Sequence, residues 1–242
     1  MRLSISGTYS AGKTFTAMAL SHHTGIPRSP AKTIREIMPD AVPGKALTEV
    51  TPAEYIQLAV RRHVGRAVNE ALLGGSFIAD GSSLQEWTYA AVRVEFGMDP
   101  GAHVDGPPPA KTPEMGFFEE VTAQLGHAFR QHVKESFDGF VHLRNEFPLG
   151  ADGHRPMNEK FRSKCDDLLL VALDELDIPY IQLGGSVTDR LEAIVRRFDL
   201  PVVRDIDEAI ALAGEDYAKV DWRLEKVRSQ STAAVAATSA AA

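Results

Sequence analysis

A glycine-rich loop, GTYSAGKT at residues 7–14, directly follows a short apolar run at the start of the chain. Its pattern, GxxxxGKT, is typical of phosphate-binding loops, and the strand pattern before it and helix pattern after it give the context that the motif requires. Backbone N–H groups of such a loop converge on phosphate oxygens, and the next helix adds the positive end of its dipole. The loop therefore predicts a site for a nucleoside triphosphate. We expect Lys13 to reach the terminal phosphates and Thr14 to bind Mg²⁺. The other loop residues expected at this site are Gly7, Thr8, Ser10, Ala11 and Gly12.

Strand and helix patterns alternate along the rest of the chain. Strands are expected over 2–6, 77–80, 140–143 and 179–183, and helices over 13–21, 52–73, from Ser83 onward, 116–135, 158–176 and 187–198. This alternation predicts an α/β fold in which helices cover both faces of a mostly parallel sheet, with ligands at the carboxyl ends of the strands.

The domain organisation follows from the same patterns. We expect one domain over 1–228, with a Pro- and Gly-rich insertion without regular structure at 97–114. The low-complexity tail at 229–242 is expected to be disordered, or partly helical where it joins the preceding segment.

Composition and charge limit the partners of this chain. The formal net charge is −7, which argues against a general nucleic-acid binder because such surfaces need an excess of Lys and Arg. No apolar stretch is long enough to span a membrane, and no signal segment is recognisable, so we expect a cytoplasmic protein. A small-molecule acceptor is the expected partner, and a homodimer is compatible with the sequence.

A carboxylate ends the apolar strand pattern Phe77-Ile78-Ala79-Asp80. Phosphoryl transfer needs a carboxylate near the metal and the incoming nucleophile, so Asp80 is expected to hold Mg²⁺ or to accept the proton of the acceptor. The sequence leaves both roles open. Trp87, shortly after Asp80, could stack on a flat acceptor ring, although core packing explains its spacing equally well.

A polar segment, ADGHRPMNEKFRSK at 151–164, is predicted to form an arginine lid over about 148–164. Arg155 and Arg162 could close over the triphosphate, since the planar donor fork of arginine matches phosphate oxygens. We expect residues 148–160 to be mobile without nucleotide and ordered when it is bound.

Four stretches together resemble the P-loop kinase family that includes the ribosylnicotinamide kinase domain of bacterial NAD-salvage proteins. They are GTYSAGKT, FIADGSSLQEWTYA, LRNEFPLGADGHRPMNEKFR and LDIPYIQLGGSVTDRLEAI, and the resemblance spans about residues 1–200. It implies a nucleoside-kinase-like P-loop fold that uses ATP and Mg²⁺. It also implies that Asp80 is the strand-end carboxylate, Glu146 the acidic position ahead of the lid, and Arg155 the lid arginine.

The resemblance extends to two further places and fails at two others. Arg35 and Glu36 match an Arg-Glu pair on the acceptor side, while the loop of Gly185 resembles the one that borders adenine, where Arg190 could stack on the base. The residues after Asp80 are Gly-Ser-Ser in place of Thr-Asp, and the 97–114 loop is added. Both differences lie near the expected acceptor site.

The leading hypothesis is an ATP- and Mg²⁺-dependent kinase for a hydroxyl of a nucleoside or nucleoside-like compound, with Asp80 or Glu36 as the proton acceptor. The alternative is a regulatory ATPase that changes shape for a protein partner. Arg61, Arg62 and Arg66 are expected to form a solvated helix face rather than to bind a substrate.

Overall fold

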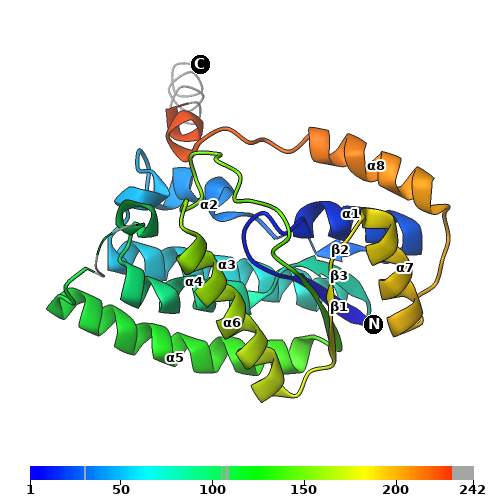
Figure 1. The fold of residues 1–242 in the computed structure, drawn as a ribbon, viewed down its shortest axis with the longest axis horizontal. Coiled ribbons are helices and arrows are strands. Elements are labelled where there is room, and N and C mark those ends of the chain that lie inside the picture. The colour runs from blue at the N-terminus through cyan, green and yellow to red at the C-terminus, as the bar shows by residue number, and fades with distance from the viewer. Residues whose placement is uncertain (30, 105, 107–108, 231–242) are drawn as a thin grey trace.

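The computed structural model describes residues 1–29, 31–104, 106 and 109–230, and in them the chain forms one five-stranded parallel sheet (Figure 1). The strands are β1 (Arg2–Ser6), β2 (Arg28–Ser29), β3 (Phe77–Asp80), β4 (Gly139–Leu143) and β5 (Tyr180–Leu183), in the order β2-β3-β1-β4-β5. The strand order reverses beside β1, and a crevice for ligands forms at such a point in open parallel sheets. The sheet therefore places the glycine-rich loop at its centre.

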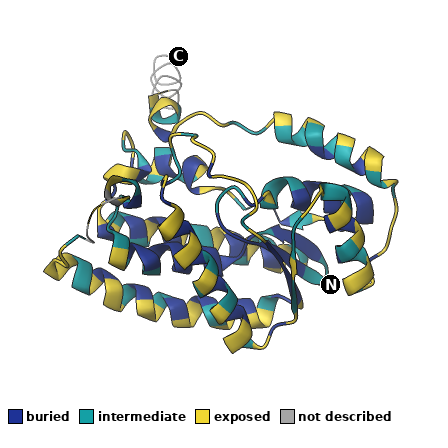
Figure 2. Ribbon diagram, in the orientation of Figure 1, coloured by how far each residue is buried: buried dark blue, intermediate teal, exposed yellow. Residues whose placement is uncertain are grey.

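Helices lie on both faces of the sheet, as Figure 1 shows. They are α1 (Lys13–Thr24), α2 (Ile34–Ala41), α3 (Pro52–Leu73), α4 (Ser83–Phe96), α5 (Pro113–Ser136), α6 (Glu159–Leu176), α7 (Val187–Phe198) and α8 (Ile206–Ala218), with two short 3-10 helices, η1 (Leu47–Glu49) and η2 (Pro100–His103). One layer contains α1, α7 and α8, and the other contains α4, α5 and α6. Figure 2 shows that buried residues line the space between these layers and the sheet.

Alternation along the strands assigns side chains to the two layers. Leu3 and Ile5 of β1 and Ile78 of β3 pack in the core beneath α1, α7 and α8. Phe77 of β3 and Phe140 of β4 pack on the opposite face, against α4, α5 and α6. Successive side chains of a strand point to opposite faces, and both faces are covered here, so the strands are apolar on both sides.

The expected α/β architecture is confirmed, and several helix ends agree with their signals. The Thr51 and Ser186 capping boxes are present, and Gly25 caps α1, which extends to Thr24 rather than ending at Ser21. The pattern Ser83-Leu84-Gln85-Glu86 predicts Ser83 as the cap of α4, and this prediction is wrong by one residue. Ser82 is the cap, because its hydroxyl accepts from Leu84 N and its own N–H donates to the Gln85 side chain at 2.6 Å.

Three elements were not anticipated: β2, α2 and α8. The expectation of no regular structure over 97–114 is also wrong in part, because this segment contains η2 and the first residues of α5. Pro113 is the first residue of α5 behind the Thr112 cap, since proline is well suited to the first turn of a helix.

The end of the chain was expected to be a low-complexity tail, 229–242. Only residues 229 and 230 of it are described, as the end of a short helix over 225–230, and the rest lies outside the described residues. Among the described helices, none combines the length and the apolar character that crossing a membrane requires.

Candidate active site

The glycine-rich loop joins the carboxyl end of β1 to the N-terminus of α1. Two of its glycines are required by geometry. Gly12 caps α1 with φ 88°, and Gly7 has φ 131°, with space so limited that an added Cβ would lie 2.8 Å from the Leu143 carbonyl oxygen. A side chain at either position would strain the backbone, so the sequence pattern directly fixes the loop geometry.

Lys13 lies at the first position of α1, and its Nζ donates to the Thr8 carbonyl oxygen at 2.6 Å. Burial lowers the pKa of Lys13 to about 8, although the nearby Asp80 carboxylate acts in the opposite direction. An ammonium in such a place gains from an anionic ligand, because the ligand compensates for lost hydration. The geometry is therefore suited to a phosphate group.

Thr14 and Asp80 meet at the carboxyl ends of neighbouring strands. The Thr14 hydroxyl donates to Asp80 Oδ2 at 2.6 Å, and the parallel register of β1 with β3 pairs Ile5 with Asp80. Hydroxyl and carboxylate oxygens are ligands that Mg²⁺ accepts, usually together with water and phosphate oxygens. These two residues fit a magnesium site beside the loop.

A pocket of about 250 Å³ lies over the loop and the start of α1. We call it the nucleotide pocket. Its lining residues are Ser10, Ala11, Gly12, Lys13, Thr14, Phe15, Pro148, Gly150, Arg155, Tyr217 and Trp222. Loop residues thus form one wall, and the predicted lid supplies part of the other.

The lid segment contacts the loop through Ser10. The Ser10 hydroxyl accepts from Arg155 Nη1 and from Gly150 N, each at 3.1 Å. Asp152 orients Arg155, because its carboxylate accepts from the Arg155 backbone N–H at 3.0 Å and lies 3.4 Å from Nε. Burial alone would raise the pKa of Asp152, yet the N–H groups and the charges of Arg155 and Arg35 lower it below its usual value. Arg155 is therefore held in position by an ionised carboxylate, and its role as a lid arginine stays a prediction.

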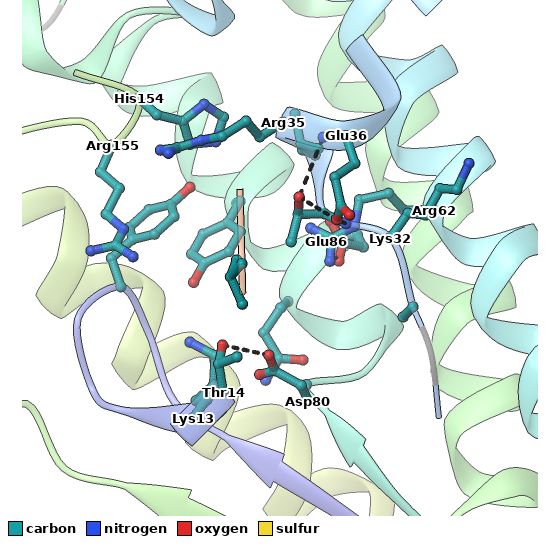
Figure 3. A pocket seen from close by; sticks show the side chains of 18 of the residues that line it. Lys13, Thr14, Lys32, Arg35, Glu36, Arg62, Asp80, Glu86, His154 and Arg155 are labelled. Carbon is teal, nitrogen blue, oxygen red and sulfur yellow. Dashed lines mark hydrogen bonds and ion pairs between the residues drawn. The ribbon is translucent and has the colours of Figure 1, made fainter. Parts of the chain in front are cut away.

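A larger pocket, of about 450 Å³, opens beyond Asp80 and is called the acceptor pocket below. It shares Lys13, Thr14, Arg155 and Trp222 with the nucleotide pocket. In Figure 3, Lys13, Thr14 and Asp80 lie at one end, Arg155 and His154 on one side, and Lys32 and Arg62 on the other. The two pockets therefore meet at these four shared residues.

Arg35 and Glu36 both line the acceptor pocket from the start of α2. Arg35 is buried and forms an ion pair with Asp152 at 2.8 Å, which links α2 to the lid. Glu36 caps its own helix, because its Oε2 accepts from the backbone N–H and the hydroxyl of Thr33, each at 2.8 Å. The structure thus brings both predicted residues to the pocket with structural partners.

A buried ion cluster lies deep in the acceptor pocket and was missed by the sequence interpretation. Arg62 of α3 lies 3.1 Å from the Glu86 carboxylate, and Arg66 lies 3.6 Å from it. The Glu86 side chain is 1% exposed and that of Arg66 is 3% exposed, so the expected solvated face is wrong for both arginines and holds only for Arg61. The four-residue spacing of Arg62 and Arg66, which puts both on one helix face, was the available signal.

Trp87 does not line either pocket. Its indole packs in the core, 4.4 Å from the Arg130 guanidinium, and against Gly126, where an added Cβ would lie 2.4 Å from the indole nitrogen. The indole is therefore not placed to stack on an acceptor in either pocket. A stacked pair, Tyr9 and Tyr89, lines the acceptor pocket instead, with ring centroids 4.4 Å apart.

Arg162 is likewise buried, at 2% exposed, and lines neither pocket. Its guanidinium donates to Asn145 Oδ1 at 3.1 Å and to the Phe147 carbonyl oxygen at 2.7 Å. Asn145 Oδ1 also accepts from the Thr8 hydroxyl at 2.6 Å. The structure therefore connects Arg162 to Thr8 of the loop through Asn145 rather than placing it in a pocket, and its catalytic role stays a prediction.

Glu146 and Arg190 lie on the far side of the loop from the acceptor pocket. Glu146 Oε2 accepts from Gly185 N at 2.7 Å and lies 3.6 Å from the Arg190 guanidinium. Arg190 is buried and donates to the Ala11 carbonyl oxygen at 3.2 Å. The substrate-binding role expected of Glu146, the stacking role expected of Arg190 and the adenine-bordering role of Gly185 stay predictions, although neither Glu146 nor Arg190 lines the acceptor pocket.

Residues 219–230, called the C-terminal strap below, run from α8 across to α2, as Figure 1 shows. Trp222 of the strap lines both pockets, and its carbonyl oxygen accepts from Arg35 at 2.7 Å. The Glu225 carboxylate contacts the imidazole of His154 in the predicted lid. The strap therefore closes the site from a part of the chain that no motif indicated.

Comparison with known proteins agrees with this geometry at the level of the fold. Two solved structures of deoxyadenosine kinase from M. mycoides, one with bound dCTP and one with dCMP and a flexible dCDP, are each 14% identical to this chain. They cover 82% of it and 99% of their own length, with TM-scores of 0.51 and 0.50. At this identity the likeness concerns the fold alone, which is that of a P-loop nucleoside kinase.

No curated protein sequence matches the chain. The narrower resemblance to ribosylnicotinamide kinases is not among these findings and stays a prediction. Residues 2–190, by contrast, match a family described as "AAA domain", and this span includes the loop, Asp80, Arg155 and β5. The chain belongs to this AAA domain family of P-loop proteins.

Proposed function

We propose that this protein is an ATP- and Mg²⁺-dependent phosphotransferase that acts on a hydroxyl of a small molecule, a nucleoside or nucleoside-like compound. The observation that carries the proposal is the junction of the two pockets, where Lys13, Thr14 and Arg155 line both. A nucleotide-hydrolysing site needs room for water, whereas a kinase needs a second pocket in line with the terminal phosphate. The similar solved structures are also named as kinases.

On the nucleotide side, the loop N–H groups and Lys13 would bind the phosphates of ATP. Thr14 and Asp80 would hold Mg²⁺, which supplies positive charge against the phosphate oxygens when bound. Arg155 would neutralise the charge that develops on the transferred group, because its guanidinium already lies against the loop at Ser10.

On the acceptor side, the reacting hydroxyl would lie near Asp80. Asp80 Oδ2 is bonded to Thr14 and Glu36 Oε2 is bonded to Thr33, so each carboxylate would use its other oxygen to take the proton. Asp80→Asn and Glu36→Gln distinguish them. Replacement of the true base removes the acidic limb of the pH profile of kcat, whereas the other replacement leaves that limb in place.

The Glu86 cluster offers a contact for the body of the acceptor. Both Glu86 carboxylate oxygens are buried without a hydrogen-bond partner in the described part of the protein. The guanidinium groups of Arg62 and Arg66 lie close enough to pair with Glu86 by charge but are not hydrogen-bonded to it. A buried acceptor of this kind is stabilised when a donor reaches it. Hydroxyl or N–H groups of a nucleoside-like acceptor would supply such donors.

The test is acceptor-stimulated release of ADP, measured against a panel of nucleosides, sugars and amino alcohols. Lys13→Ala is expected to abolish turnover while the fold survives, as judged by circular dichroism and thermal unfolding. Lys134→Ala, at an exposed position on α5 outside both pockets, is the matched control and should retain activity. Full activity of Lys13→Ala would overturn the assignment.

The alternative, a nucleotide-dependent regulatory ATPase, makes a different prediction for the same assay. It would release ADP slowly and at one rate whatever acceptor is added, and a protein partner would bind in only one nucleotide state. ADP release that rises with one class of small molecule, together with the phosphorylated product seen by mass spectrometry, would exclude it.

A further inference from the structure

Two cations on one wall of the acceptor pocket form no ion pair with any residue that the structure describes. Arg28 belongs to β2, Lys32 to the connection between β2 and α2, and both line the pocket. In the part of the chain that the structure describes, neither side chain makes a hydrogen bond or an ion pair. The other arginines of this pocket are engaged, since Arg35 pairs with Asp152 and both arginines of α3 face Glu86.

The carboxylates of the pocket are committed elsewhere. Asp80 accepts from Thr14, Glu36 caps α2 through Thr33, and Asp221 pairs with Arg223 within the strap. None of these groups is therefore arranged to neutralise Arg28 or Lys32.

The charge balance of the pocket is the reverse of that of the whole chain, which has 26 Lys and Arg against 33 Asp and Glu. The positively charged lining residues are Lys13, Arg28, Lys32, Arg35, Arg62, Arg66 and Arg155, and the negatively charged ones are Glu36, Asp80, Glu86, Asp152 and Asp221. A positive cleft in an acidic protein concentrates anions. Lys13 and Arg155 serve the triphosphate, whereas Arg28 and Lys32 lie outside the nucleotide pocket.

The position of the two cations suits the far end of an acceptor. The register of β2 with β3 pairs Ser29 with Ala79, so Arg28 and Lys32 flank the strand that ends in Asp80. Figure 3 places Lys32 and Arg62 across the pocket from Arg155. A molecule whose hydroxyl lies near Asp80 would thus extend its other end toward the β2 wall.

We propose that the acceptor is an anion, a hydroxyl compound that carries a carboxylate or a phosphate monoester, and that Arg28 and Lys32 bind this charged group. The inference rests on the proposed kinase function. Removal of the two charges should weaken use of an anionic acceptor about tenfold to a hundredfold, because charge-assisted hydrogen bonds are the stronger kind. It should leave a neutral acceptor nearly unaffected.

The test uses matched pairs of compounds. Uridine against orotidine isolates a carboxylate, and ribose against ribose 5-phosphate isolates a phosphate monoester. Thermal unfolding of the protein saturated with ADP and magnesium is followed as each compound is added. We expect stabilisation by the anionic member of at least one pair, with no such difference in the double variant Arg28→Gln, Lys32→Gln. Arg61→Gln, which removes an exposed charge of α3, is the control and should behave as the unaltered protein.

The outcomes separate the two proposals. Equal stabilisation by both members of every pair, or an anion preference that survives in the double variant, overturns the anionic acceptor. Anion-selective binding without acceptor-stimulated ADP release supports the anion site but overturns the proposed kinase function. The pair that responds identifies the anion as a carboxylate or a phosphate monoester.

Discussion

The two pockets of this protein are built in different ways. Most of the nucleotide pocket comes from consecutive residues around the loop, and their backbone N–H groups and glycines are its main features. The acceptor pocket is assembled from side chains of β2, α2, α3, α4, the lid and the strap, which are distant in sequence. A backbone site is fixed by local conformation, whereas a side-chain site depends on long-range packing. Nucleotide binding should therefore tolerate changes that redirect the choice of acceptor.

Arg155 lines both pockets, and its replacement is expected to have the largest effect on activity. We expect Arg155→Ala to lower kcat about a hundredfold to a thousandfold, because it removes a donor aimed at charge that develops in the transition state. The affinity for ATP should change only a few fold. Arg155→Lys should restore part of the rate, since a point charge cannot reproduce the planar fork.

Single-turnover kinetics together with equilibrium binding of an ATP analogue measure both quantities. Arg144→Ala, at an exposed position on the connection that follows β4, provides the control. An unchanged kcat in Arg155→Ala would return this residue to a purely structural role in the lid.

A second substitution changes the charge balance of the acceptor pocket alone. Glu86→Ala leaves the buried guanidinium group of Arg66 and the largely buried one of Arg62 without their counter-charge. Removing one partner of a buried ion pair typically costs about 3 to 5 kcal/mol of unfolding free energy. Urea denaturation measures this loss, and saturation with an ATP analogue should still stabilise the variant.

The same helix supplies the control for that variant. Glu95 pairs with Lys164 at the surface, where both side chains are about half exposed, so Glu95→Ala should cost roughly 0.5 kcal/mol or less. Equal losses in the two variants would contradict the buried cluster.

The third test uses pH to probe the nucleotide side. The pKa of Lys13 in the folded protein, about 8, is below its ordinary value of 10.5, so its burial as an ammonium disfavours folding below pH 8. That cost is lost as the pH rises from about 8 to 10.5, and above this range the group no longer disfavours folding. The affinity for phosphate has the opposite pH dependence, because phosphate binds the charged ammonium form of Lys13.

Affinity for an ATP analogue should accordingly fall above pH 8, by up to about tenfold per pH unit. Fluorescence titration from pH 7 to 10 checks this. Lys13→Arg keeps its charge throughout that range and should flatten the dependence, whatever its absolute affinity. A flat profile in the unaltered protein would show that Lys13 is not the titrating group.

The smallest expected effect concerns the residue where the strap meets both pockets. Trp222→Ala should raise KM for ATP and for the acceptor by a few fold each, because it removes one wall that the pockets share. Steady-state kinetics with each substrate varied in turn measures both values. A change in only one KM would assign the indole to one side, and Trp222→Phe should restore much of the loss.

The sequence predicted the residues of the nucleotide pocket better than those of the acceptor pocket. Gly7, Gly12 and Lys13 could be recognised because one short segment carries the whole geometric requirement. Asp80 could be placed because an apolar strand precedes it. The alternation of patterns was sufficient for the parallel sheet.

The remainder depended on contacts between distant segments. Glu86 and Arg62 are ordinary helix residues until α3 packs on α4, and β2 is too short, at two residues, to carry a pattern. The burial of Trp87 and Arg162 could not be decided, because the sequence does not show which side of a helix becomes buried. Trp222 follows α8 in the sequence, and only the folded path of the chain brings it to the two pockets.

The shared wall has a further consequence for ligand design. Because the two pockets are continuous at Lys13 and Arg155, one molecule could occupy both. A nucleoside joined through a phosphate chain to an acceptor analogue would bind its second half as an intramolecular event, at an effective concentration set by the linker. Such a bisubstrate compound should bind more tightly than either half, and the chain length of the best one would report how far the acceptor hydroxyl lies from the nucleotide.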